Sequence, residues 1–116
     1  IDKEAVTTVV VADGVTEIGY KAFLDCINLV AADISNGVKV ILGYAFANCG
    51  NLELDKLPSS LTYIASNAFQ GCDNLALTEL PSSMTYIGFW VFDGCIGLTS
   101  LTIPISKAPT LKDKSV

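Results

Sequence analysis

The sequence contains no histidine and no arginine. Histidine is the most frequent general base in enzymes and the most frequent side-chain ligand of metals. Arginine supplies the planar guanidinium group that holds phosphate or carboxylate groups through two parallel hydrogen bonds. The absence of both removes the usual groups of hydrolytic chemistry and of zinc sites. We therefore expect a protein that is not an enzyme, with no catalytic residue, no metal site and no cofactor.

Positive charge and long apolar stretches are also scarce. The chain has 7 lysines against 12 carboxylates, and its formal net charge is −5. Such a chain repels polyanions, which disfavours nucleic acid and anionic membrane surfaces as partners. The longest strictly apolar run, residues 9–12, is far shorter than the ~20 residues of a membrane-spanning helix. We expect no membrane insertion, and the start at Ile1 instead of methionine predicts a processed product or an excised fragment.

What the sequence does contain is a repeat of 23 residues. The 116 residues, 51% of them hydrophobic, suit one compact domain, and five columns of residues recur within it at this spacing. The cysteine column is Cys26, Cys49, Cys72 and Cys95, and the phenylalanine column is Phe23, Phe46, Phe69 and Phe92. The other columns are Ile18, Ile41, Ile64 and Ile87, then Ala22, Ala45, Ala68 and Val91, and finally Leu29, Leu52, Leu75 and Leu98.

The columns keep their spacing without an insertion or deletion, which defines four repeats. These are repeat 1 (residues 15–37), repeat 2 (38–60), repeat 3 (61–83) and repeat 4 (84–106). Residues 1–14 form a partial repeat or an N-terminal cap, and residues 107–116 form a C-terminal tail or cap. A unit of this size cannot bury its own apolar side, so neighbouring repeats must stack and share one core. The sequence therefore predicts a solenoid of four coils and a partial N-terminal coil.

Each repeat is expected to hold two short strands and one tight turn. In repeat 3, residues 61–64 are β-branched and aromatic, as in a brief strand. Residues 66–71 suit one helical or 3₁₀ turn, which Ser66 caps and Gly71 ends. A second strand is expected at residues 75–80, before Pro81 stops the pairing. The fold class is thus an α/β repeat.

The repeat resembles the BspA-like, or treponemal-type, leucine-rich repeats of bacterial and protist surface proteins. The element Ile-Gly-x-x-Ala-Phe-x-x-Cys, seen at residues 18–26 and with valine for alanine at 87–95, carries the resemblance together with Leu98, Leu101 and Pro104. The resemblance implies a right-handed leucine-rich-repeat solenoid, exported to the cell surface or secreted, that serves adhesion or other protein contacts. It implies no catalytic residue.

One position departs from the family pattern. Three residues after the conserved leucine the chain has Ala32, Asp55, Thr78 and Leu101, so only repeat 4 keeps a leucine there. In repeats 2 and 3 a leucine comes one residue earlier, at Leu54 and Leu77. This shift predicts a bulge or altered register that turns these leucines inward and spares Asp55 from burial.

Two polar columns have both a structural and a functional interpretation. The cysteines are too widely spaced for a zinc site, and a column of reduced, packed thiols is favoured over disulfides between neighbouring coils. Asparagine recurs at one corner, at Asn28, Asn51 and Asn74, and Gly97 replaces it in repeat 4. We expect these amides to bond backbone groups at the corner and not a ligand.

Two sets of residues are candidates for binding a partner. The first set lies on the predicted long strand, just before each inward aliphatic residue, and consists of Asp33, Lys56, Glu79 and Thr102. The second set is aromatic and consists of Tyr63, Tyr86, Phe89 and Trp90. The two tyrosines are expected to stack on neighbouring coils, which either offers contact area or only stabilises the sheet. Phe89 and Trp90 either form an interaction patch or shelter the end of the solenoid under residues 107–116.

The leading hypothesis is a non-enzymatic interaction or adhesion module of a bacterial cell-surface or secreted protein. Its partner would be a protein or a glycan, such as a host surface or matrix component. The alternative is a structural spacer or assembly segment of a longer repeat protein, which would associate end to end with copies of itself.

Overall fold

The structure, a computed structural model, describes residues 2–103 and the backbone of residues 110–111. Its regular secondary structure consists of short strands. They are β1 (Thr8–Val10), β2 (Glu17–Ile18), β3 (Ala31–Asp33), β4 (Val40–Ile41), β5 (Tyr63–Ile64), β6 (Tyr86–Ile87) and β7 (Thr110–Leu111).

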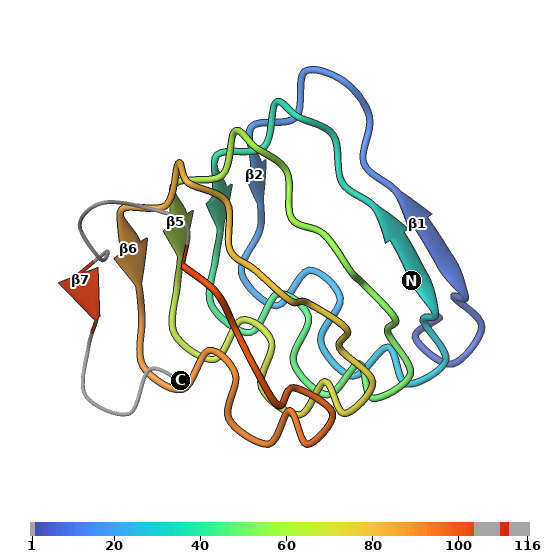
Figure 1. The fold of residues 1–116 in the computed structure, drawn as a ribbon. Helices are drawn as coiled ribbons and strands as arrows, with labels where there is room; N and C mark the ends of the chain where they lie inside the picture. The colour runs from blue at the N-terminus through green and yellow to red at the C-terminus, as the bar shows by residue number, and fades with distance from the viewer. Residues whose placement is uncertain (1, 104–109, 112–116) are drawn as a thin grey trace.

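The strands form two parallel sheets on opposite sides of the molecule (Figure 1). Five of them, in the order β2-β4-β5-β6-β7, make what we call the short-strand sheet. The other sheet pairs β1 with β3. The chain crosses between the two sides and returns in every repeat, so segments far apart in the sequence lie next to each other (Figure 1). This arrangement is the stacked repeat that the sequence predicts.

The register of the short-strand sheet follows the repeat. From β2 to β6 every residue pairs with the one 23 positions later, so Ile18, Ile41, Ile64 and Ile87 form a continuous row. The predicted strand at residues 61–64 is present as β5, over its last two residues. β7 pairs one residue further along the chain, Thr110 beside Tyr86. Part of the segment expected to be a tail or cap therefore extends the sheet.

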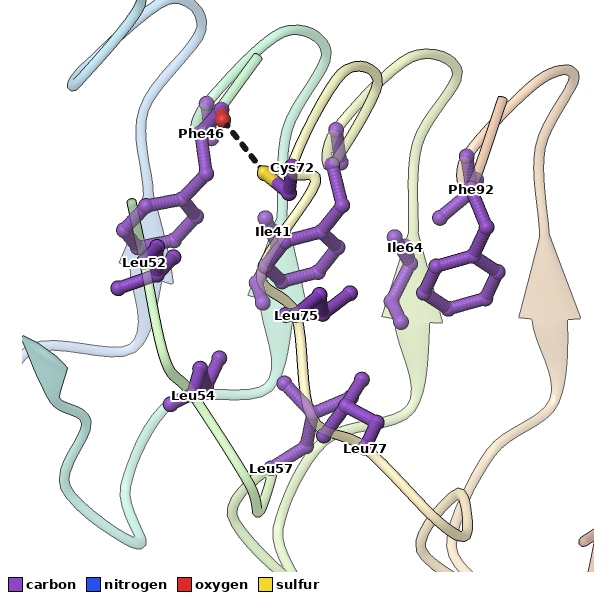
Figure 2. Close-up of a cluster of buried hydrophobic side chains, with 14 of the residues drawn as sticks. Ile41, Phe46, Leu52, Leu54, Leu57, Ile64, Cys72, Leu75, Leu77 and Phe92 are labelled. Carbon is purple, nitrogen blue, oxygen red and sulfur yellow. Dashed lines mark hydrogen bonds between the residues drawn. The ribbon is translucent and has the colours of Figure 1, made fainter. Parts of the chain in front are cut away.

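The core consists of the predicted columns stacked one above another (Figure 2). Phe46 and Phe69 are fully buried, and their rings stack with centroids 5.4 Å apart and planes 1° apart. The ring of Phe23 lies 5.3 Å from that of Phe46, and the ring of Phe92 lies 6.1 Å from that of Phe69. Complete burial of one such side chain contributes about 1.5–3 kcal/mol, so the columns are the main source of stability.

The prediction of a helical or 3₁₀ turn at residues 66–71 is wrong, and so is the α part of the predicted α/β fold class, because the described residues contain no helix. Alternate peptides point in different directions there. The N–H groups of Ala68 and Gln70 bond carbonyls three residues back, whereas those of Asn67, Phe69 and Gly71 bond carbonyls of repeat 4. A helix would keep all these bonds inside one repeat.

The backbone conformation explains the difference, since each turn contains two residues with positive φ. In repeat 3 these are Asn67 (φ 65°) and Gly71 (φ 73°), and both interrupt any right-handed helical path. Ser66 also differs from the predicted cap, because its Oγ accepts a hydrogen bond from the Phe89 N–H at 3.1 Å. We call these segments, residues 19–26, 42–49, 65–72 and 88–95, the turn side.

The opposite side consists of β1, β3 and their counterparts at residues 53–57, 76–80 and 99–103, and we call it the long-strand face. The predicted strand at residues 75–80 is absent apart from an isolated bridge between Glu79 and Thr102. The predicted inward turn of the displaced leucines is confirmed: Leu54 and Leu77 are only 7% and 2% exposed, while Asp55 is exposed. We call residues 53–57 the bulged segment of repeat 2. The inward shift of these leucines places two consecutive residues outward, which is incompatible with a regular pleat.

Candidate functional site

The four predicted strand residues all lie on the long-strand face. Asp33, Lys56, Glu79 and Thr102 are exposed. Each precedes an inward aliphatic residue, as predicted: the residues that follow are Ile34, Leu57, Leu80 and Ile103, all buried or half-buried. The column is therefore open to solvent and rests on the core.

Three hollows lie on this face around the bulged segment of repeat 2. The first groove, about 280 Å³, lies between β3 and this segment and is lined by Asp33, Asp55 and Lys56 among others. The second groove, about 320 Å³, lies between repeats 2 and 3 and has Asp55, Lys56 and Glu79 in its lining. A more open hollow of about 600 Å³ is bordered by Glu53, Asp55 and Asp73.

Asp55 lines all three hollows and was not among the predicted site residues. Its exposure follows from the inward position of Leu54, which the sequence did signal. The hollows could not be read from the sequence, because they depend on how far the neighbouring segments stand apart once the ladder is interrupted.

The aromatic set is divided between two places. Tyr63 and Tyr86 stack on the short-strand sheet, with ring centroids 4.4 Å apart and planes 8° apart, as predicted. Phe89 and Trp90 lie at the corner after β6, 36% and 41% exposed, with ring centroids 5.4 Å apart. Their predicted exposure is confirmed. The alternative was that residues 107–116 cover Phe89 and Trp90. Apart from the backbone of β7, these residues lie outside the described part of the chain.

A second aromatic pair at the turn side was missed. The rings of Tyr20 and Tyr44 meet edge to face at 6.2 Å, and Tyr20 is 62% exposed. The Nζ atom of Lys21 lies 5.1 Å from the Tyr20 ring centroid. Tyr20 is the counterpart of Phe89, and Tyr44 that of Trp90, at the 23-residue spacing. The sequence signal that could have revealed the Tyr20–Tyr44 pair is that it occupies the same two repeat columns as Phe89 and Trp90.

The cysteines are buried free thiols. They also do more than pack: the thiols of Cys49, Cys72 and Cys95 donate hydrogen bonds to phenylalanine carbonyls of the preceding repeat at 3.1, 3.0 and 3.0 Å. Figure 2 shows the bond from Cys72 to Phe46. Cys26 has no such bond to a described residue.

Burial raises the pKa of every thiol. The pKa of Cys49 rises to about 12 and that of Cys95 to about 11, while that of Cys72 lies higher still. The pKa of Cys26 is raised too, with burial again as the main cause. These thiols are protonated at neutral pH and are poor nucleophiles, because the thiolate is the reactive form. Among the described residues, no group of His, Cys, Asp and Glu side chains could hold a metal ion.

Two of the three asparagines, Asn28 and Asn51, have the structural role that we predicted, whereas the side chain of Asn74 bonds no described residue. The side-chain amide of Asn28 donates to the Glu4 carbonyl at 2.9 Å, and that of Asn51 donates to the Ile27 carbonyl at 2.8 Å. In repeat 4 the backbone N–H of Gly97 instead donates to the Asp73 carbonyl at 3.1 Å. A Cβ atom at Gly97 would lie only 2.5 Å from that oxygen, so no side chain fits there.

The BspA-type leucine-rich repeat region matches residues 2–114 in six copies. The chain belongs to the BspA-type leucine-rich repeat family. The match extends into both segments outside the four repeats, residues 2–14 and 107–114.

Two crystal structures of leucine-rich repeat proteins resemble this BspA-type chain. A protein of T. pallidum is 25% identical with a TM-score of 0.79, and the match covers 90% of this chain and 60% of that one. A protein of Bacteroides ovatus is 35% identical with a TM-score of 0.76, over 85% of this chain and 26% of that one. The chain thus spans less than two thirds of either protein. No curated protein matches it.

In this BspA-type chain the aromatic corner carries backbone strain. Trp90 has φ 51°, and its counterparts Lys21, Tyr44 and Asn67 have φ between 56° and 65°. A bulky residue in the left-handed region costs of the order of 1–3 kcal/mol. The repeat imposes this conformation on every member of the column, so it does not by itself mark Trp90 as a binding residue.

Proposed function

We propose that the chain is a non-enzymatic interaction module of a bacterial cell-surface or secreted protein. Leucine-rich repeat families are generally protein-interaction modules, and this membership is the first support. The observation that carries the proposal is the long-strand face, where the side chains that differ between repeats are exposed beside grooves. The described residues have no helix long and apolar enough to cross a membrane.

We further propose that the repeats wind as a right-handed solenoid of four 23-residue coils after a partial first coil. The partner in this proposal is a protein or a glycan, such as a host surface or matrix component. Both candidate sets belong to it: the charged column Asp33, Lys56, Glu79 and Thr102, and the aromatic residues Tyr63, Tyr86, Phe89 and Trp90.

The test is binding of the purified chain to immobilised extracellular-matrix proteins and to a glycan array. Each candidate set is replaced by alanine in a separate variant. A matched control replaces Asp13, Thr16, Glu17 and Lys39, which are exposed and carry the same number of acidic, basic and hydroxyl groups as the charged column. We expect loss of binding in one candidate variant and not in the control. Unchanged binding in both candidate variants would reject the assignment.

The alternative, a spacer or assembly segment, is favoured by the last turn. The N–H groups of Trp90, Phe92 and Gly94 donate to no described residue, although their counterparts in repeats 1 to 3 all bond the next repeat. Turn N–H groups at the end of a stack can continue the ladder into another unit. Native mass spectrometry distinguishes the two functions, since an assembly segment forms end-to-end oligomers and a binding module stays monomeric.

A further inference from the structure

The bulged segment of repeat 2, in the middle of the long-strand face, has backbone groups that bond no described residue. The N–H groups of Asp55, Lys56 and Leu57 donate to no described residue, and the carbonyls of Asp55 and Lys56 accept from none. In repeat 1 the equivalent strand, β3, is paired with β1. Strand backbone groups without partners in the protein are the usual docking template for another extended chain.

The two grooves run along either side of this segment. Buried Leu57 lines both, so each combines an apolar wall with the backbone groups of this segment. At about 280 and 320 Å³ they lie at or below the lower end of the range for small-molecule pockets, ~300–1,000 Å³. Grooves of this size suit single side chains of a longer ligand.

The charge around the grooves is negative. Asp33 lines the first groove, Glu79 the second, and Asp55 both, while Lys56 is the only cation among the lining residues. Glu53 and Asp73 add two more carboxylates at the adjoining hollow. A partner that carries lysine or arginine side chains complements this charge.

We propose that the long-strand face binds an extended polypeptide segment that places lysine or arginine side chains in the two grooves. Carbonyl groups of the bound segment accept hydrogen bonds from N–H groups among residues 55–57, and Asp33, Asp55 and Glu79 attract its cationic side chains. This inference rests on the proposed function and names the partner class of one of its two candidate surfaces.

The test uses the full ¹⁵N-labelled chain and follows its amide signals by NMR at low salt. The probe is a capped octapeptide of alternating threonine and lysine. The same peptide with glutamate for lysine reverses the charge, and spermine carries a similar positive charge without a peptide backbone. We expect the lysine peptide to shift the amides of residues 55–57, the glutamate peptide to shift none, and spermine, which the carboxylates also attract, to shift those three amides less than the lysine peptide does.

Two charge reversals complete the experiment. We expect Asp55→Lys to weaken binding of the lysine peptide about tenfold, a change of about 1.4 kcal/mol, and Asp33→Lys to weaken it in the same direction. The matched control is Glu17→Lys, an exposed carboxylate on the short-strand sheet, which should leave affinity within about twofold. The amide spectra report directly whether each variant is folded.

Three results would overturn the inference. They are equal binding to Asp55→Lys and Glu17→Lys, an identical shift map with spermine, or shifts centred on Phe89 and Trp90. The last of these would leave the proposed function intact and move it to the aromatic surface. By contrast, if neither alanine variant loses binding to the matrix proteins or the glycan array, the proposed function is rejected, whatever the result with the lysine peptide.

Discussion

The turn side and the long-strand face are made by the same repeats and obey different rules. On the turn side the inter-repeat bonds recur residue by residue: Phe23, Phe46 and Phe69 each donate to the carbonyl 22 positions later. On the long-strand face the spacing changes along the stack. The N–H groups of Val30 and Glu53 each bond a carbonyl 23 positions earlier, whereas that of their counterpart Ala76 bonds one 22 earlier.

The two sides differ because their residues make different numbers of interactions. A turn residue such as Phe69 buries its ring, bonds the next repeat and accepts a thiol bond, so any shift costs several interactions at once. A residue such as Asp55 has an exposed side chain that forms no hydrogen bond to a described residue. Regularity is enforced where burial is complete, and the sequence varies more freely on the exposed face, where we propose that a partner binds.

Removing one ring from the turn side should have the largest effect. We expect Phe69→Ala to lower the free energy of unfolding by about 3–5 kcal/mol, because it opens a cavity in the stacked column. Thr78→Ala, on the long-strand face, should change it by less than about 0.5 kcal/mol, since Thr78 is exposed. Urea unfolding measures both. Comparable losses in the two variants would contradict the difference between the sides.

The tight approach of turns on the same side predicts the next effect. A Cβ atom at Gly88 would lie 2.5 Å from the Ser66 amide nitrogen and 2.9 Å from the Ala65 carbonyl carbon. Both are backbone atoms, so Gly88→Ala should destabilise by about 1–3 kcal/mol. The matched control is Gly50→Ala, where the nearest atom would be 3.9 Å away. An unchanged midpoint in Gly88→Ala would mean that adjacent turns separate easily.

The buried thiols make stability depend on pH in the alkaline range. An unfolded cysteine ionises near its ordinary pKa of 9.0, whereas burial raises the pKa of Cys49 to about 12 and that of Cys95 to about 11. Above pH 9 the unfolded chain therefore loses protons that the folded chain keeps. The free energy of unfolding should fall by at most about 1.4 kcal/mol per pH unit for each such thiol, until the folded thiols ionise.

Unfolding curves at pH 8 and pH 10.5 check this dependence. The decrease should be smaller in Cys49→Ala than in the parent chain, because one of the contributing groups is gone. A decrease of the same size in both would assign the alkaline instability to other groups.

Much of the core could be predicted from the sequence, because its columns repeat without interruption. The inward isoleucine, phenylalanine, cysteine and leucine columns are all present. The displaced leucines at Leu54 and Leu77 also identified the bulge. These features depend on side-chain polarity and spacing, which the sequence states directly.

Four features could not be predicted. The same residue types favour one 3₁₀ turn and two consecutive tight turns, so the sequence did not distinguish the two conformations. Positive φ at Lys21, Tyr44 and Trp90 contradicts the preferences of these residue types, because the repeat and not the residue sets the backbone there. The direction of a thiol proton and the width of the grooves depend on neighbouring repeats.

A comparison within the cysteine column should give the smallest effect. Cys26 and Cys72 are both fully buried, but only Cys72 donates to a carbonyl, that of Phe46. Alanine at either position removes the sulfur, and at position 72 it also leaves a buried acceptor without its donor. We expect Cys72→Ala to destabilise by about 1 kcal/mol more than Cys26→Ala. Cys72→Ser, which retains a donor, should recover part of that difference in urea unfolding. If both alanine variants lose the same stability, the thiols contribute through packing alone and the ladder of S–H bonds adds nothing to the regularity of the turn side.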